Sequence, residues 1–332
     1  MSGMRAMVLA AGRGERMRPV TDLLPKPMLP IANIPVMGWV LQHLARHGFT
    51  NVIANIHHLA ETIVDHFGSG GQYGVDLSFS YEEDLMGSAG GVKQCMDFFD
   101  DETFLVIGAD DLTAMDLSAF LAQHRSAGAL ASIGLVEVEN TAEFGVVVTD
   151  VNGRIQRFIE KPKGKAPSNL ANTQIYLFER EILDFVPPDQ PYDFGFQAFP
   201  AMVDAGVPFY GFKLDGYWRD IGSLDDYIDA QADILESKLD VSIPGTELSP
   251  GVWVGDECAI DATARLKAPL ILGGHCRVES KAQLGGGTAV GSDVTIENEA
   301  FIERSVIWGG LTVQRSTSTR DAVVTSEGVF RG

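Results

Sequence analysis

Five basic side chains gather in the first thirty residues of an acidic chain. They are Arg5, Arg13, Arg16, Arg18 and Lys26. Only two acidic residues accompany them, so this stretch carries +3, whereas the whole chain of 332 residues carries −20. Gly12 and Gly14 flank Arg13, and glycine lets backbone N–H groups approach anionic oxygens closely. Guanidinium groups pair with such oxygens bidentately, so the stretch predicts a phosphate-binding loop. The alternative is a strand-to-helix turn with solvated charges.

A pair of carboxylates, Asp110 and Asp111, directly follows the apolar run of residues 105–109. Adjacent carboxylates at the end of a strand suit a hard cation with oxygen ligands, such as Mg²⁺. The alternative is a solvated turn or the N-cap of the next helix. The pair is therefore a candidate metal site.

A glycine-rich run, Gly87–Gly91, lies between an expected strand and an expected helix. Glycines there let a flat base or sugar lie against the backbone, although a plain helix start would use the same residues. Glu82 or Glu83, just before the run, can accept hydrogen bonds from the N1–H and N2 amine of guanine. Carboxylates repel the acceptor edges of uracil and thymine, so these residues favour GTP.

Apolar strands alternate with amphipathic helices through the first two thirds of the chain. The expected order is strand 6–11, helix 35–48, strand 52–56, helix 61–67, strand 77–81, helix 91–98 and strand 104–109. A hairpin of residues 145–148 and 155–159 turns at Asn152-Gly153. This alternation predicts an α/β fold with a doubly wound, mixed and mostly parallel sheet.

The tail of the chain repeats every six residues. Its aliphatic positions are Leu248, Val254, Ile260, Leu266, Leu272, Val278, Leu284, Val290, Ile296 and Ile302. This period predicts a hexapeptide-repeat left-handed parallel β-helix, with three hexads per coil and the aliphatic side chains stacked inward. We therefore expect a catalytic domain over residues 1–237, a linker over 238–247 and the β-helix over 248–332.

Composition limits the classes of protein that this chain can belong to. It has no apolar run of about 20 residues, so we expect no membrane span. Three cysteines do not make a disulfide framework, and the start of the chain lacks a signal-peptide pattern, so we expect a cytoplasmic protein. The negative net charge argues against nucleic acid as a partner.

The stretch from Leu9 to Met28 resembles the signature of the sugar-1-phosphate nucleotidylyltransferases, or NDP-sugar pyrophosphorylases. The matching residues are Leu9, Ala10, Ala11, Gly12, Gly14, Arg16, Met17, Pro19, Thr21, Pro25, Lys26, Pro27 and Met28. Further matches follow: Gly87–Gly90 to L-G-T-A-G, Glu160–Pro162 to E-K-P, Asn172–Tyr176 to N-x-G-[IL]-Y, and Trp218–Gly222 to W-x-D-[IV]-G. The chain departs from the family at Gly108 and Ala109, usually Asn and Gly, and at Gln174, usually Gly. The resemblance implies a Rossmann-like nucleotidyltransferase fold.

The resemblance also implies a role for each matching residue. The expected catalytic residues are Arg16, Lys26, Asp110 and Asp220, of which Asp110 and Asp220 would bind Mg²⁺. The expected nucleotide-binding residues are Leu9, Ala10, Ala11, Gly12, Gly14, Arg16, Glu83, Gly87, Ser88 and Asp110. The expected residues for the sugar phosphate are Lys26, Gly145, Glu160, Lys161, Asn172 and Asp220.

The implied reaction joins a nucleoside triphosphate to a sugar 1-phosphate, releasing pyrophosphate. A catalytic domain followed by a short β-helix resembles the mannose-1-phosphate guanylyltransferases, so we expect GTP and mannose 1-phosphate. The string GERMRP instead resembles the muramate-1-phosphate uridylyltransferases. The alternatives are uridylyl or thymidylyl transfer to another hexose 1-phosphate, or a regulatory subunit that binds the nucleotide-sugar with little turnover. We expect the β-helix to support a homo-oligomer or regulation.

Overall fold

The structure is a computed structural model in which residues 3–100 and 102–332 are described. The chain divides into two compact units. The first comprises Met1–Arg13, Pro25–Pro27 and Met37–Trp218, and the second comprises Gly14–Leu24, Met28–Val36 and Arg219–Gly332. Parts of the signature loop thus belong to the same unit as the tail. The division into residues 1–237, 238–247 and 248–332 stays a prediction.

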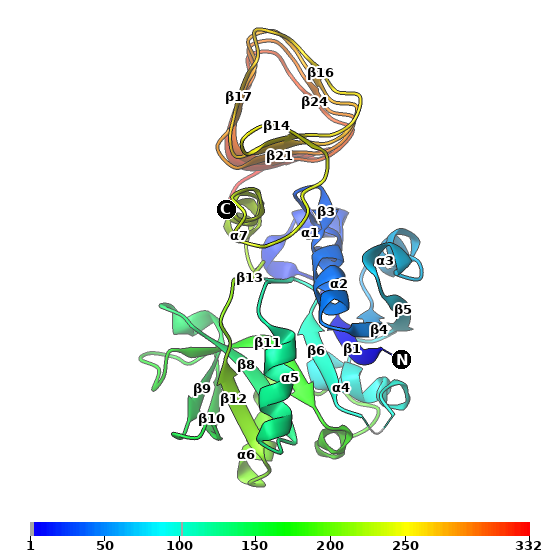
Figure 1. Ribbon diagram of the computed structural model, residues 1–332, viewed down its shortest axis with the longest axis vertical. Coiled ribbons are helices and arrows are strands. Elements are labelled where there is room, and N and C mark those ends of the chain that lie inside the picture. Colours follow the sequence, from blue (N-terminus) through cyan, green and yellow to red (C-terminus); the bar gives the residue numbers. More distant parts are fainter. Residues whose placement is uncertain (1–2, 101) are drawn as a thin grey trace. The chain divides into compact units, whose positions relative to one another are not determined.

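A mixed sheet forms the centre of the first unit (Figure 1). Its strands are β1 (Met4–Leu9), β4 (Phe49–Ile56), β5 (Asp76–Tyr81), β6 (Phe104–Gly108), β8 (Ala131–Glu137), β9 (Gly145–Thr149), β10 (Ile155–Glu160), β11 (Leu170–Phe178) and β12 (Phe209–Lys213). β1, β4, β5 and β6 are parallel, while β11 runs antiparallel to β6, β8 and β9. This confirms the predicted fold class, and the 145–160 hairpin is β9 with β10.

The helices of this unit follow its strands. They are α2 (Val36–Arg46), α3 (Ala60–Phe67), α4 (Gly87–Gln94), α5 (Leu117–Ser126) and α6 (Phe199–Asp204). α4 begins four residues earlier than the predicted helix over 91–98, because the glycine-rich run is its first turn rather than a loop. The short strands β7 (Asp111–Thr113) and β13 (Trp218–Asp220) complete the elements before the tail.

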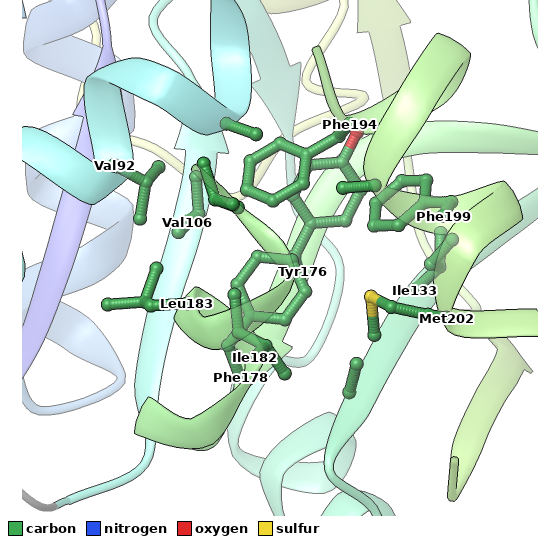
Figure 2. Close-up of a cluster of buried hydrophobic side chains, with 14 of the residues drawn as sticks. Val92, Val106, Ile133, Tyr176, Phe178, Ile182, Leu183, Phe194, Phe199 and Met202 are labelled. Atoms are coloured by element: carbon green, nitrogen blue, oxygen red, sulfur yellow. The ribbon is translucent and has the colours of Figure 1, made fainter. Parts of the chain in front are cut away.

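An aromatic core fixes β11 against the turn Phe194–Ala198 and the start of α6. Figure 2 shows Tyr176 and Phe178 of β11 beside Phe194 and Phe199. The ring centroids of Tyr176 and Phe194 are 5.4 Å apart. All four side chains are buried, and burial raises the pKa of the Tyr176 hydroxyl far above its usual value. The core therefore holds rigid the two segments that approach the expected sugar site.

The second unit contains the elements around the signature loop and the tail. The former are α1 (Val20–Leu23), β2 (Pro30–Ile31), β3 (Ile34–Pro35) and α7 (Leu224–Leu235). The tail strands are β14 (Thr246–Ser249), β15 (Val252–Val254), β16 (Ala259–Ile260), β17 (Arg265–Lys267), β18 (Leu270–Leu272), β19 (Arg277–Val278), β20 (Gln283–Gly285), β21 (Thr288–Val290), β22 (Thr295–Ile296), β23 (Phe301–Ile307), β24 (Thr312–Val313), β25 (Ser318–Thr325) and β26 (Gly328–Phe330).

The tail coils into a parallel β-helix with a triangular section, drawn in yellow to orange in Figure 1. Val252 pairs with Leu270, and Leu270 with Thr288, so one coil spans eighteen residues there, as the hexads predict. The prediction is wrong for Leu248, which is 62% exposed. Leu248 lies on β14, which runs antiparallel to β15 and so does not continue the inward stack.

Candidate active site

Lys26 and Asp110 form an ion pair in the first unit. Lys26 begins the short 3-10 turn Lys26–Met28, and Asp110 directly follows β6. The Lys26 Nζ contacts Asp110 Oδ2, and both side chains are largely shielded from solvent. Two residues expected to handle phosphate and metal thus lie together, although they are 84 positions apart in the chain.

Asp111 is oriented differently from Asp110. It is fully buried, and its Oδ1 accepts a hydrogen bond of 3.2 Å from Trp218 Nε1, which also lies 3.2 Å from the Thr173 carbonyl. A Cβ on residue 108 would overlap Asp111 Oδ2, which explains why glycine stands where the family usually has asparagine. Asp111 Oδ1 therefore anchors the Trp218 ring, whereas Asp110 contacts Lys26.

Arg16 and Asp220 lie together in the second unit. Arg16 Nη2 is 3.6 Å from Asp220 Oδ2, and Asp220 is much less exposed than Arg16. A Cβ on Gly222 would lie 3.1 Å from Arg16 Nη1, so the glycine of the W-x-D-[IV]-G motif leaves room for the guanidinium. Gly14 has φ +63°, and its carbonyl accepts a 2.9 Å hydrogen bond from Thr21 Oγ1. The convergence of Asp220 with Asp110 on one ion stays a prediction.

The end of β1 is held by neighbouring strands before the loop opens. The Leu9 carbonyl accepts a 3.0 Å hydrogen bond from Ala109 N–H, and Ala10 N–H donates to Asn55 Oδ1 at 2.9 Å. Ala11 is buried, whereas a Cβ on Gly12 would meet no atom within 4 Å. The backbone is thus closely packed at the end of β1 and open at Gly12.

The glycine-rich run packs against a second backbone segment. Gly87 has φ +73°, and a Cβ there would lie 2.6 Å from the Tyr192 carbonyl. Ser88 Oγ donates to Asp193 Oδ2 at 2.8 Å and accepts from Phe194 N–H at 2.9 Å. Gly87 is therefore required for close backbone packing, and Ser88 already has protein partners.

Glu82 cannot read a base as the sequence suggested. It is 1% exposed, and its two carboxylate oxygens accept hydrogen bonds from Asn55 Nδ2 and Met86 N–H. This part of the prediction is wrong, because both oxygens are bonded beneath the surface. Glu83 is exposed, so it keeps its place among the expected nucleotide contacts.

Glu160 ends β10 inside a cradle of two glycines. A Cβ on Gly145 would lie 2.8 Å from Glu160 Oε2, and one on Gly195 would lie 2.6 Å from the same atom. Burial raises the pKa of the Glu160 carboxyl above its usual range, the positive charge of Lys161 lowers it, and Asp193 raises it. The cradle fixes the carboxyl beside Lys161.

Asn172 is oriented by its own strand. Its Nδ2 donates to the Tyr176 hydroxyl at 2.9 Å, and its Oδ1 accepts from Gln174 N–H at 3.0 Å. Gln174 has φ +59° at an irregularity in the pairing of β11 with β8. The left-handed backbone that favours glycine is therefore retained although glutamine replaces it.

Sequence reasoning missed two residues that organise these segments. Asp193 caps the π-helical turn Phe194–Ala198 by accepting from Gly195 N–H and Phe196 N–H, and it binds Ser88. Asn55 links Ala10 to Glu82. The available signals were an Asp before an aromatic-rich segment, for Asp193, and a single polar residue inside the apolar run 52–56, for Asn55.

Within residues 3–100 and 102–332, no group of three or more His, Cys, Asp or Glu side chains could hold a metal ion by itself. No helix in the described part of the chain is long and apolar enough to cross a membrane.

Comparison with known proteins places these features in a family. Residues 5–237 match the family model described as "Nucleotidyl transferase". The chain is 40% identical over 321 residues to a UTP–glucose-1-phosphate uridylyltransferase from Synechocystis sp., covering 92% of this chain and 83% of that one. It is 31% identical over 312 residues to a mannose-1-phosphate guanylyltransferase from Mycobacterium tuberculosis, covering 93% and 81%.

A solved structure supports the fold. The crystal structure of a putative glucose-1-phosphate thymidylyltransferase from Bacillus anthracis, in complex with a sucrose, matches with a TM-score of 0.64 and 23% identity. The match covers 72% of this chain and 96% of that chain. The signature loop, the family model and the two relatives agree, and the chain therefore belongs to the nucleotidyl transferase family as a sugar-1-phosphate nucleotidylyltransferase.

Proposed function

We propose that the protein transfers a uridylyl group from UTP to glucose 1-phosphate, forming UDP-glucose and pyrophosphate. The observation that carries this choice is the 40% identity to a UTP–glucose-1-phosphate uridylyltransferase over 92% of the chain. The sequence-based preference for GTP rested partly on Glu82, whose carboxylate is buried and bonded to Asn55 and Met86. GTP with mannose 1-phosphate remains the second candidate, because the mannose-1-phosphate guanylyltransferase of M. tuberculosis is 31% identical.

In this proposal the phosphate oxygen of the sugar 1-phosphate attacks the α-phosphorus in line, and pyrophosphate leaves. The attacking group is already an anion, so the protein needs no covalent nucleophile and acts by alignment and charge neutralisation. Arg16 neutralises the departing β- and γ-phosphates, and Lys26 contacts phosphate near the reacting centre. Lys161 holds the sugar phosphate while Glu160, in its glycine cradle, accepts hydrogen bonds from sugar hydroxyls.

The family typically uses Mg²⁺, and the oxygen-only chemistry of Asp110 and Asp220 fits that ion. Asp110 contacts Lys26, and Asp220 lies near Arg16. Either cation could also pair with a phosphate. In this proposal Asp110 and Asp220 would hold one such ion, which would neutralise phosphate charge when bound.

The test is a screen for pyrophosphate release with UTP, GTP and dTTP, each combined with glucose 1-phosphate or mannose 1-phosphate. We expect the highest kcat/KM for UTP with glucose 1-phosphate. A higher value for GTP with mannose 1-phosphate would select the second candidate. Tight UDP-glucose binding without pyrophosphate release from any pair would instead indicate a regulatory subunit. The expected homo-oligomer is tested separately by light scattering.

A further inference from the structure

Asn55 and Glu82 form a buried pair at the carboxyl ends of β4 and β5. Asn55 is 4% exposed and Glu82 is 1% exposed. Asn55 Oδ1 accepts from Ala10 N–H at 2.9 Å, and Asn55 Nδ2 donates to Glu82 Oε1 at 2.7 Å. The other oxygen of Glu82 accepts from Met86 N–H at 3.0 Å. Three consecutive hydrogen bonds thus join the loop after β1 to the turn before α4.

α4 is built around this pair. A Cβ on Gly91, in the middle of the helix, would lie 2.6 Å from Glu82 Oε1 and 2.8 Å from Asn55 Nδ2. α4 therefore approaches the pair at a residue without a side chain. The turn is also held from outside, because the Glu82 carbonyl accepts from His57 Nδ1–H at 2.9 Å and the Met86 carbonyl accepts from Tyr192 N–H at 2.8 Å.

We propose that Asn55 and Glu82 are positioning residues for the nucleoside triphosphate. They set the spacing between the phosphate loop that follows Ala10 and the segment 83–88 on the base side. This inference rests on the proposed function, because that function places the triphosphate between these segments. The hydrogen-bond polarity allows one arrangement only: an amide oxygen faces Ala10 N–H, an amide N–H faces one carboxylate oxygen, and the other carboxylate oxygen faces Met86 N–H.

A polarity swap tests the pair. In Glu82→Gln the single amide oxygen can serve Asn55 or Met86 but not both, so one buried donor loses its acceptor. In Asn55→Asp an acceptor replaces the donor that faces Glu82. The double variant Asn55→Asp/Glu82→Gln restores all three hydrogen bonds, with donor and acceptor exchanged only in the bond between residues 55 and 82. We expect each single variant to raise KM for UTP about tenfold, the effect of one unsatisfied buried group, and the double variant to recover.

Asn55→Asp has an additional signature in its pH profile. When one of the two facing carboxyls holds a proton, it donates to the other and replaces the lost amide donor. KM for UTP in this variant should therefore rise with pH, relative to wild type, while the double variant should follow wild type. The other titratable groups that face Glu82 are His57, at its carbonyl, and Cys95, whose thiol pKa is raised by burial and by the charge of Glu82. Both are present in every variant.

Asn51→Asp is the matched control. Asn51 lies four residues earlier on β4, where its Nδ2 donates to the Gly3 carbonyl at 2.7 Å, so the same change is made outside the pair. We expect it to leave KM for UTP and its pH profile unchanged. KM for the sugar 1-phosphate should stay unchanged in all variants, which a general loss of structure would not allow.

Amide hydrogen exchange of residues 82–90 provides a readout that needs no turnover. Both single variants should accelerate exchange there, and the double variant should restore protection. If wild type fails to use UTP but uses another triphosphate, the proposed function fails, and the inference is tested by the same KM comparison with that triphosphate together with the exchange result. Unchanged exchange and KM in the single variants would overturn the inference, as would a double variant no better than its parents.

Discussion

Lys26 and Asp110 make an ion pair in which the lysine Nζ contacts one carboxylate oxygen, and both side chains are mostly shielded from solvent. The pair brings the signature loop to the end of β6 within the first unit. The positive charge of Lys26 thus lies beside Asp110 when no substrate is bound. The pair also keeps Lys26 close to Asp110, the proposed ligand of the metal at the reacting phosphate.

Replacing Glu160 with glutamine should stabilise the protein at neutral pH. Burial raises the pKa of the Glu160 carboxyl in the folded state, so folding favours its protonated form. The stability from this group is fully present below its unfolded pKa and is lost as pH rises through the higher folded pKa. Glu160→Gln, which is neutral at every pH, should therefore gain stability over wild type as pH rises.

Urea denaturation of both proteins at acidic and neutral pH measures this difference. The two midpoints should nearly coincide in acid and separate toward neutral pH, with the variant higher. A variant less stable than wild type at neutral pH would contradict the effect of burial on Glu160.

Adding a methyl group at Gly195 should impair sugar binding. The Cβ of Gly195→Ala would lie 2.6 Å from Glu160 Oε2 and 3.3 Å from Phe158 Cε1, so it would displace the carboxyl. We expect KM for the sugar 1-phosphate to rise about tenfold, as one extra methyl group in a packed pocket can cause. Gly71→Ala is the control, because a Cβ there meets nothing within 4 Å. Equal kinetics of the two variants would exclude Glu160 from the sugar site.

Asp233 should support the segment that carries Asp220. Asp233 is nearly buried on α7 and accepts from Arg219 Nε at 2.8 Å and from Lys238 Nζ at 2.5 Å. Asp233→Ala should lower the free energy of unfolding by about 2 kcal/mol, the range for hydrogen bonds to charged groups, with less from the half-exposed lysine. Asp225→Ala is the control, since this exposed residue lies 3.9 Å from Arg304. Equal losses measured by urea denaturation would contradict the role of burial.

The inward stack of the β-helix should depend on Ile296 and not on Leu248. Ile296 is fully buried, whereas Leu248 is 62% exposed although both occupy the same position of the hexad. Ile296→Ala should cost about 2 to 5 kcal/mol of unfolding free energy, as for other buried aliphatic truncations. Leu248→Ala should change it by about 0.5 kcal/mol or less. Denaturation followed by tryptophan fluorescence compares them, and similar losses would mean that β14 is packed like the other coils.

Periodicity explains which parts of the fold the sequence could predict. Strands and helices of the sheet show as apolar runs, and the coils repeat every six residues, so both folds were predictable. Leu248 fits the hexad but lies on an antiparallel strand. The chain reverses at residues 249–251 without interrupting the six-residue spacing, so the sequence pattern does not reveal the reversal. The predicted helix starts at residue 91 because glycine disfavours helices, yet α4 begins at Gly87, where the backbone packs closely against Tyr192.

The candidate site was predictable only where a motif carries its residues. Lys26 and Asp110 come from motifs 84 positions apart, and the structure pairs them. Asn55 and Asp193 belong to no motif that was recognised, because their roles depend on tertiary contacts with Glu82 and Ser88. The sequence alone also could not show that Glu82 is buried and Glu83 exposed, because the two are adjacent residues of the same type.

The most direct test of the proposed chemistry is pyrophosphate release from UTP and glucose 1-phosphate by wild type and by Asp110→Asn. The amide can still accept a hydrogen bond from Lys26, so the melting temperature should stay close to that of wild type. Losing the negative ligand should lower kcat by about a hundredfold to a thousandfold, comparable with removal of one transition-state contact. An Asp110→Asn protein that keeps the wild-type rate would contradict the assignment of Asp110 to the metal and the reacting phosphate.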